Sequence, residues 1–281
     1  MIASRFYGAF TLAKWFNLLL DSSKRPKTGP TLLFGMVAKA ITSLQHPLVK
    51  RAVQLRLDRK KREEEKRVLV SGKKLIADLA AFWTIDILFS EMSEKLIPSL
   101  ETLRVTHSVL KKITGVEEPD GWAAIVPLPE EQSLETMDAV LILDQVSDPG
   151  NMGTLWRTAL GLGWQGIWLT PGCVDPFNDK ALRASQGAVF RLPFERIFPD
   201  QIISWSQMKN AAIYTADLEG DPIDQCKIIR PMALVLGNEG QGPGSWTQTS
   251  SRKVTILIHG VESLNVASAG AILLYAMRPT R

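Results

Sequence analysis

The stretch "AVLILDQVSDPGNMGTLWRTA" (residues 139–159) contains the signals of one strand, one turn and one helix. Residues 139–146 are mostly apolar without alternation, which is typical of a strand buried on both faces of a parallel sheet. Asp148, Pro149 and Gly150 favour a turn after this strand, and Asn151 can cap the helix that follows. The stretch therefore predicts the first unit of an α/β domain.

Predicted strands and helices continue to alternate up to the end of the chain. Further strands are predicted at 166–172, 211–217, 232–240 and 253–260, and helices at 151–163, 178–188, 200–209 and 264–278. Alternating strands and helices predict an α/β fold with a parallel sheet. In such sheets ligands bind beyond the carboxyl ends of the strands, so unusual residues there are candidates for a site.

Two later junctions carry such residues. "LVLGNEGQGP" (234–243) has three glycines around Glu239, which favours backbone held close to a ligand but lacks the GxxxxGK[ST] pattern of a phosphate loop. "ESLNVASAGAILLY" (262–275) places Ser263 and Asn265 before a helix of small residues. A turn and a helix cap would explain each junction equally well on its own.

Taken in order, these stretches resemble the three motifs of the SpoU (TrmH) family of RNA ribose 2′-O-methyltransferases in the SPOUT superfamily. The resemblance covers about 139–279, and "SQGAVFRLPF" (185–194) is a further match. It implies a deep trefoil knot at the C-terminal end of the catalytic domain and S-adenosyl-L-methionine as methyl donor. It also implies a homodimer whose active site can draw on both subunits.

The chemistry requires a ribose hydroxyl to lose its proton in line with the methyl group, with stabilisation of the negative charge on oxygen. Arg157 suits that task as a base or as an electrostatic activator; a true base would need a strongly lowered pKa. By resemblance and residue type, the catalytic positions are Arg157, Asn151, Glu239, Ser263 and Asn265. Backbone around four further positions is expected to contact the cofactor: Leu236, Gly237, Ile258 and Leu264.

Residues 36–126 predict a smaller α/β module that resembles the RNA-binding domain common in these enzymes. A helix is expected over 47–67, and residues 37–74 contain twelve basic and four acidic side chains. Such a basic segment suits RNA, and the expected contacts are Lys50, Arg51, Arg59, Lys60, Lys61 and Arg62. The alternative is a solvated helix in which the glutamates at 63–65 form i,i+4 pairs.

The predicted domain order is an N-terminal extension at 1–35, an RNA-binding domain at 36–126, a linker at 127–138 and a catalytic domain at 139–281. The extension fits a targeting peptide, a tail or a start upstream of the true one, with the last favoured. Its apolar stretch at 6–20 is interrupted by Lys14 and is short for a membrane span, so no stable membrane association is expected.

Two cysteines and three scattered histidines speak against a disulfide framework and a metal site, and they fit a cytoplasmic protein. The sequence thus predicts an S-adenosyl-L-methionine-dependent RNA 2′-O-ribose methyltransferase, with 23S-type large-subunit rRNA favoured. A tRNA methyltransferase and a non-catalytic RNA-binding ribosome-assembly factor are the alternatives. A DNA or protein methyltransferase is disfavoured because the strand followed by GxGxxG is absent from the sequence.

Overall fold

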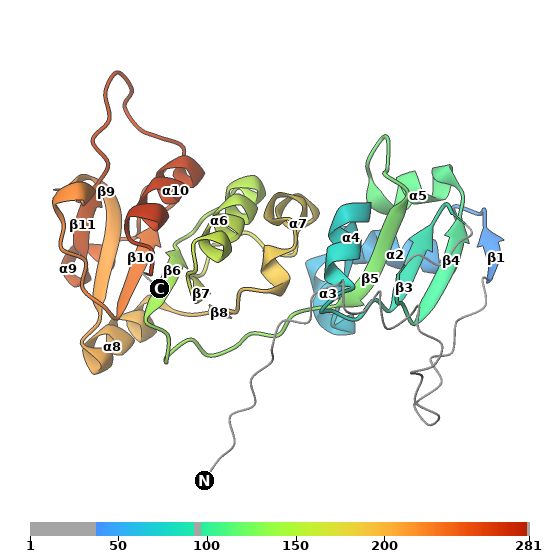
Figure 1. The fold of residues 1–281 in the computed structure, drawn as a ribbon, viewed down its shortest axis with the longest axis horizontal. Coiled ribbons are helices and arrows are strands. Elements are labelled where there is room, and N and C mark those ends of the chain that lie inside the picture. Colours follow the sequence, from blue (N-terminus) through green and yellow to red (C-terminus); the bar gives the residue numbers. More distant parts are fainter. Residues whose placement is uncertain (1–37, 93–96, 280–281) are drawn as a thin grey trace, which may run out of the picture. The chain divides into compact units, whose positions relative to one another are not determined.

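A computed structural model describes residues 38–92 and 97–279 (Figure 1). The chain from Met36 onward groups into one compact unit. The predicted extension at 1–35 lies outside the described residues. Within them, no helix combines the length and the apolar character that crossing a membrane requires.

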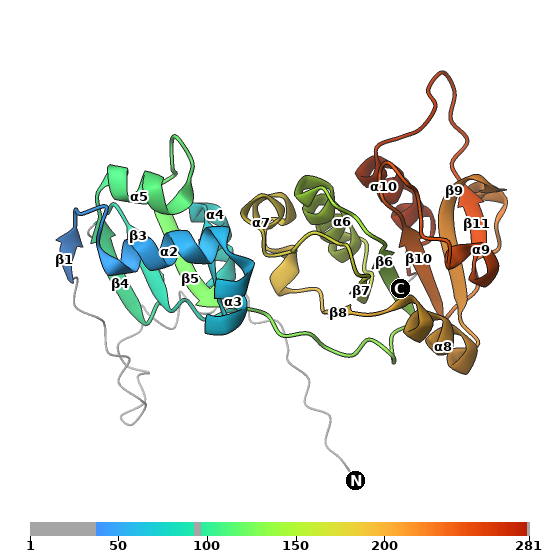
Figure 2. The same cartoon turned by 180° about the vertical axis from the view of Figure 1, so that it is seen from behind.

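The N-terminal part contains a five-stranded mixed sheet in the order β1-β4-β3-β5-β2. Its strands are β1 (Ala38–Ile41), β2 (Arg67–Ser71), β3 (Ile87–Ser90), β4 (Glu101–Val105) and β5 (Trp122–Pro127). Its helices are α2 (Pro47–Leu57), α3 (Arg59–Glu65), α4 (Lys73–Leu79) and α5 (His107–Thr114). Buried side chains of α2 and α5 pack on one face of the sheet and those of α4 on the other. Figure 2 shows α2 in front of this sheet, and Figure 1 shows it behind.

The helix predicted over 47–67 is divided at Asp58 into α2 and α3. Asp58 has an extended backbone, and its carboxylate accepts hydrogen bonds from Lys60 N (2.9 Å) and Lys61 N (3.4 Å). A short acidic side chain of this kind competes with the helix for backbone groups and is preferred as a helix cap. The sequence prediction was wrong here because helical periodicity continues across the cap.

The C-terminal part contains a six-stranded parallel sheet in the order β11-β9-β10-β6-β7-β8. Its strands are β6 (Ala139–Leu143), β7 (Gly166–Leu169), β8 (Phe194–Arg196), β9 (Ala212–Pro222), β10 (Met232–Leu236) and β11 (Arg252–Thr255). Its helices are α6 (Pro149–Gly161), α7 (Asp179–Ser185), η2 (Ala188–Phe190), α8 (Pro199–Lys209), η3 (Ile223–Gln225), α9 (Thr247–Ser250) and α10 (Val266–Ala276). The predicted α/β class with a parallel sheet is confirmed.

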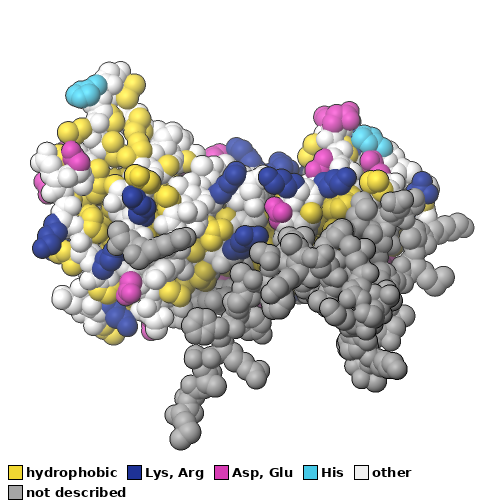
Figure 3. Space-filling view, viewed as in Figure 1, with side chains coloured by type: hydrophobic (Ala, Val, Ile, Leu, Met, Phe, Trp, Pro, Cys, Tyr) yellow, Lys and Arg dark blue, Asp and Glu magenta, His cyan; other side chains and the backbone are white. Residues whose placement is uncertain are grey.

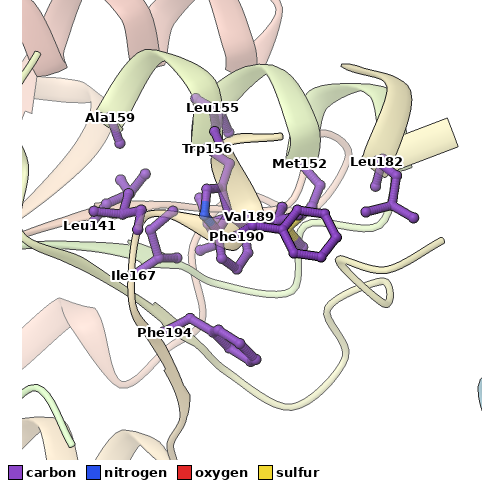
Figure 4. Close-up of a cluster of buried hydrophobic side chains, with 14 of the residues drawn as sticks. Leu141, Met152, Leu155, Trp156, Ala159, Ile167, Leu182, Val189, Phe190 and Phe194 are labelled. Carbon is purple, nitrogen blue, oxygen red and sulfur yellow. The ribbon is translucent and has the colours of Figure 1, made fainter. Parts of the chain in front are cut away.

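Both faces of the parallel sheet are buried, as the continuous apolar strands predicted. Leu141 and Leu143 of β6 join the core cluster that contains α6 and α10, whereas Val140 and Ile142 join the cluster that contains α8. Figure 4 shows side chains of α6, such as Trp156, facing the sheet. Helices on both faces leave the carboxyl ends of the strands as the place for a site.

The linker was predicted at 127–138, but Pro127 is the last residue of β5. Residues 128–138 contain no helix or strand, and they pack along the catalytic sheet. Leu134 is fully buried, Gln132 N donates to Phe194 O (2.9 Å), and the Trp205 indole donates to Glu135 O (3.1 Å). This segment is therefore a packed connection rather than a free one.

Helix α10 returns from the far end of the sheet to pack on α6 and β10, and it does so through Gly270. A Cβ at Gly270 would lie 2.3 Å from Leu155 Cδ2 and 2.7 Å from Leu236 Cδ1. The small residues of this helix thus permit a close approach that positions its N-terminus beside β10.

Candidate active site

A cavity of about 320 Å³ opens at the carboxyl ends of β10 and β11. The loop after β10, the loop after β11, the first turns of α10 and part of β9 form its walls. This position agrees with the edge of the sheet where the sequence predicted a ligand.

All four residues predicted to contact the cofactor line this cavity: Leu236, Gly237, Ile258 and Leu264. Gly237 has no room for a side chain, because a Cβ there would lie 2.3 Å from Pro243 N. The loop folds back on itself, and Asn238 and Gly242 exchange backbone hydrogen bonds of 3.1 and 2.9 Å. The fold of this loop brings its backbone to the cavity wall.

The three motifs meet at the rim of the cavity through a chain of hydrogen bonds. Asn265 Nδ2 donates to Asn151 Oδ1 (3.2 Å), and Asn151 Nδ2 donates to Glu239 Oε1 (2.7 Å). These side chains come from the starts of α10 and α6 and from the loop after β10. Residues separated by about a hundred positions thus form one polar site.

Asn265 also caps α10, since its Oδ1 accepts hydrogen bonds from Ala267 N (2.9 Å) and Ser268 N (3.3 Å). Asn265 therefore caps a helix and also takes part in the hydrogen bonds of the rim. One end of the amide fixes the helix start, and the other end is presented to Asn151. Ser263, just before it, lines the same cavity.

Asp148 caps α6 beside the network, so the prediction that Asn151 caps this helix was wrong: α6 begins at Pro149, and Asn151 lies in its first turn. The Asp148 carboxylate accepts from Asn151 N (2.8 Å) and pairs with Lys180 Nζ (3.1 Å). The hydrogen bond from the Asn151 backbone, with the Lys180 contact second, lowers the pKa of Asp148 below its ordinary value. Asn151 is thereby held by its backbone while its side chain stays free for the rim.

Two residues that the sequence analysis did not single out hold the loops around the cavity. Asp144 is buried at the end of β6 and accepts from Thr170 Oγ1 (2.7 Å), Gly244 N (2.7 Å) and the Trp246 indole (3.1 Å). Asn238 Nδ2 donates to Gln145 O (2.9 Å), and its Oδ1 accepts from Gly240 N (2.9 Å). An acidic residue ending an apolar strand and an asparagine among glycines were the available signals.

Arg157 stands apart from this group. It is exposed on α6, two turns after Asn151, and does not line the cavity. It lines a separate surface cleft with Thr154, Ala271 and Tyr275. The chain therefore brings together four of the five predicted catalytic residues, and Glu239 receives a hydrogen bond from Asn151.

Three of the basic side chains predicted to contact RNA, on α3 and the neighbouring α2, form ion pairs with glutamates. Arg59 pairs with Glu63 (2.7 Å), and Arg51 (2.7 Å) and Lys61 (3.0 Å) both pair with Glu65. The hydrogen bond from Arg59 is the main cause of the lowered pKa of Glu63. Arg59–Glu63 and Lys61–Glu65 are i,i+4 pairs of the kind that the solvated-helix alternative predicted, whereas Arg51–Glu65 joins α2 to α3. Lys50 and Lys60 are exposed.

The prediction that Arg62 contacts RNA was wrong, because this side chain is buried. Its side chain is only 3% exposed, donates to Leu55 O (2.8 Å) and Arg56 O (3.0 Å), and forms an ion pair with Asp175 of the catalytic part. The guanidinium is directed into the protein rather than toward solvent, so it cannot reach a polyanion in this arrangement.

The described residues contain no group of three or more His, Cys, Asp and Glu side chains arranged to hold a metal ion. Burial raises the pKa of the Cys173 thiol to about 11, so this cysteine stays protonated at neutral pH. A thiolate nucleophile at Cys173 is therefore disfavoured.

Both parts of the chain are similar to known proteins. Residues 138–275 match the SpoU rRNA Methylase family, and residues 46–124 match the MRM3-like substrate binding domain. The 23S rRNA (guanosine(2553)-2′-O)-methyltransferase RlmP of Bacillus subtilis is 33% identical over 228 residues, which cover 78% of this chain and 92% of the relative. An uncharacterized tRNA/rRNA methyltransferase of Synechocystis is 31% identical over 256 residues, covering 85% of this chain and 93% of the relative.

The chain is also similar to a solved structure of an rRNA methyltransferase. The AdoMet-bound rRNA methyltransferase from Sinorhizobium meliloti superposes with a TM-score of 0.75 at 28% identity. The match covers 85% of this chain and 97% of that chain.

Proposed function

Since the chain belongs to the SpoU rRNA methylase family, we propose that it is an S-adenosyl-L-methionine-dependent RNA 2′-O-ribose methyltransferase acting on large-subunit rRNA. The observation that carries this proposal is the hydrogen-bonded chain Asn265–Asn151–Glu239 at the rim of the cavity. The printed activity of the Bacillus subtilis relative supports rRNA over tRNA as substrate, and the AdoMet-bound Sinorhizobium structure supports the methyl donor.

The cavity fits that donor in size and chemistry. Its wall combines backbone at Gly237, where a Cβ would clash, with apolar side chains of Leu236 and Leu264. Such a lining suits an adenosine that is recognised by backbone groups and covered by aliphatic carbon. Leu236, Gly237, Ile258 and Leu264 would hold the cofactor, which supplies a methyl group already activated by a sulfonium sulfur.

The protein's own residues would supply position and charge. Asn151 and Asn265 hold the ribose at the cavity rim, and Glu239 fixes Asn151 through the 2.7 Å hydrogen bond. Ser263 supports the same rim. The guanidinium of Arg157 assists loss of the hydroxyl proton or stabilises the negative charge that develops on the ribose oxygen.

Arg157 can do this only if a second copy brings it to the cavity, and we propose a homodimer for that reason. The outer face of α10 carries two exposed apolar side chains, Ile272 at 43% and Tyr275 at 58%. Tyr275 and Arg157 line the same cleft between α10 and α6. Pairing this face with its copy would bury the apolar side chains and carry Arg157 to the neighbouring cavity.

The remaining proposals follow the family resemblance. The C-terminal part would form a deep trefoil knot, supported by β10 lying between β6 and β9 and by the return of α10 onto α6. Residues 36–126 would bind RNA and 139–281 would catalyse transfer, with 127–138 between them. The match of residues 46–124 to a substrate binding domain supports this division. The two free cysteines fit a cytoplasmic location.

Within the basic segment, Lys50 and Lys60 are the simplest phosphate contacts because both are exposed. To bind a phosphate, three further side chains would first have to release their glutamate partners: Arg51, Arg59 and Lys61. Arg62 has no place in this interface because it is buried.

The test is methyl transfer with mapping of the product. Purified protein, radiolabelled S-adenosyl-L-methionine and either large-subunit rRNA or tRNA from cells lacking the gene are combined, and 2′-O-methyl positions are mapped. The proposal expects cofactor binding and one new 2′-O-methyl site in the rRNA. If only the tRNA became labelled, tRNA rather than rRNA would be the substrate. Absence of cofactor binding would favour a non-catalytic assembly factor.

A further inference from the structure

A second cleft, of about 310 Å³, lies between α4 of the N-terminal sheet and the α6–η2 region of the catalytic part. Three cationic side chains line it, Lys74, Arg157 and Arg191, whereas Asp78 is the one carboxylate among its described lining residues. We refer to it as the α4–η2 cleft. On the face in Figure 3, lysine and arginine side chains gather over α4, α6 and α7.

Within the described part of the chain, the cations of this cleft form no ion pairs, unlike Arg59, Lys61 and Arg62 of α3. Lys74, Arg157 and Arg191 are exposed, and none forms an ion pair with any carboxylate in residues 38–92 and 97–279. An RNA phosphate bound here would release its condensed counterions, and no carboxylate would first have to be displaced from the cations. The α4–η2 cleft is therefore better prepared for a polyanion than the basic helix.

The cleft also carries an aromatic ring beside a cation. The Arg191 guanidinium lies 4.4 Å from the centroid of the Phe82 ring, and Phe82 is 42% exposed. A guanidinium held on an aromatic face is pre-oriented for phosphate, and exposed aromatic rings are surfaces on which unpaired bases stack. Phosphate contacts together with stacking describe single-stranded RNA.

The walls of the cleft are fixed by packing between the two parts of the chain. Trp83 and Phe190 make an edge-to-face contact with ring centroids 5.7 Å apart. A Cβ at Gly187 would lie only 2.8 Å from Leu75 Cδ1. The two sides therefore present their charges as one surface, and Arg157 connects that surface to the proposed catalytic chemistry.

We propose that the α4–η2 cleft binds a single-stranded RNA segment next to the target nucleotide, with Lys74 and Arg191 on its phosphates and Phe82 under a base. This inference rests on the proposed function and adds a binding site to it. It places RNA contacts on the α4 side of the N-terminal sheet, in addition to those proposed on α2 and α3.

The experiment measures affinity for a fluorescent 20-nucleotide single-stranded RNA of mixed sequence from 50 to 250 mM salt. Lys74→Ala/Arg191→Ala is compared with Lys209→Ala/Lys227→Ala, which removes two exposed charges elsewhere on the catalytic part. Loss of two phosphate contacts should reduce the slope of log K against log salt by about 1.4, with little change in the control. Phe82→Ala should weaken binding by about tenfold without changing the slope.

Affinity for S-adenosyl-L-methionine, measured on the same samples, verifies folding, and it should match the wild type in every variant. An unchanged slope in Lys74→Ala/Arg191→Ala, or an equal fall in the control, would overturn the site. If the variants change the slope and affinity as expected but the wild type transfers no methyl group, the cleft is supported and the proposed reaction is overturned. A wild type that does not bind RNA would overturn both.

Discussion

Asn265 provides the start of a helix and one end of the polar rim with a single amide. Its oxygen accepts from the backbone of α10, and its nitrogen donates to Asn151. A residue of this kind is placed correctly only while the helix start is intact. Stability and catalysis at the rim are therefore coupled, and a substitution that separates them is informative.

Asn265→Ser is that substitution. A serine hydroxyl can still cap the helix, so the free energy of unfolding should stay within about 0.5 kcal/mol of the wild type. The amide that holds Asn151 would be lost, and methyl transfer should fall by about 100-fold because the ribose is no longer held in line.

Asn265→Ala is the matched comparison, because it removes the cap as well and should cost about 1 kcal/mol more. Urea unfolding and single-turnover methyl transfer measure the two effects. If the serine variant transferred methyl groups as fast as the wild type, the rim would not position the substrate.

At the scale of elements, α3 is bound to the catalytic part by one buried ion pair. Arg62 is 3% exposed and Asp175 is 11% exposed, and their contact joins a helix of the N-terminal sheet to a loop of the catalytic sheet. The other charges of α3 are on the surface. Neighbouring arginines and lysines of one basic run therefore have different roles.

Arg62→Ala should destabilise the protein by about 3–5 kcal/mol, because it leaves the Asp175 carboxylate without its partner in a largely buried position. Lys60→Ala, on the same helix but exposed, should change stability by no more than about 0.5 kcal/mol. The midpoint of urea unfolding measures both. Equal effects of the two substitutions would contradict the structural role of Arg62.

The contact of α10 with α6 gives a second prediction at this scale. Gly270→Ala places a Cβ 2.3 Å from Leu155 Cδ2, so it should destabilise by about 1–3 kcal/mol as side chains shift. Leu236, the other neighbour, lines the cavity, and the affinity for S-adenosyl-L-methionine should fall as well.

Gly161→Ala is the control for Gly270→Ala, because nothing lies within 4 Å of a Cβ at that position of α6. It should be neutral or stabilising by up to about 1 kcal/mol through helix propensity. Calorimetry and cofactor titration would show the difference. A harmless Gly270→Ala would mean that the close approach of α10 is not required.

Long apolar strands of the catalytic part could be predicted from the sequence, because burial on both faces leaves an unbroken apolar run. β8 could not, since three residues carry no period. β1, a strand of four residues at the edge of the N-terminal sheet, was likewise not predicted. The α2–α3 break was missed because capping by Asp58 depends on a backbone angle rather than on hydrophobic spacing.

At the scale of the whole molecule, one core cluster runs through both sheets. Leu75 and Leu79 of α4 belong to the same buried cluster as Phe190 and Leu141 of the catalytic part. The sequence predicted two domains and a linker because charge and composition change between them. It could not show that one face of each packs into a shared core, since that depends on contacts between distant residues.

For the site as well, the residues could be predicted from local motifs, whereas the contacts between distant residues could not. The cofactor-contact positions and the rim residues follow from motifs, and all of them except Asn151 line the one cavity, while Asn151 bonds to its rim. The hydrogen bond between Asn151 and Glu239 could not be predicted, because residue spacing does not determine which side chain of α6 meets the loop after β10. Only the helix geometry separates Asn151 from Arg157 by almost two turns and directs Arg157 to another surface.

The central claim is that the cavity of one protomer and Arg157 of a second copy form one methyl-transfer site. Subunit complementation tests it most directly. Arg157→Ala and Asn265→Ser proteins, each nearly inactive alone, are co-expressed with different tags, and transfer to large-subunit rRNA is measured. A mixed dimer has one intact cavity facing one intact arginine, so random pairing should restore about one quarter of wild-type activity. A mixed sample no more active than the two variants alone would contradict the shared site.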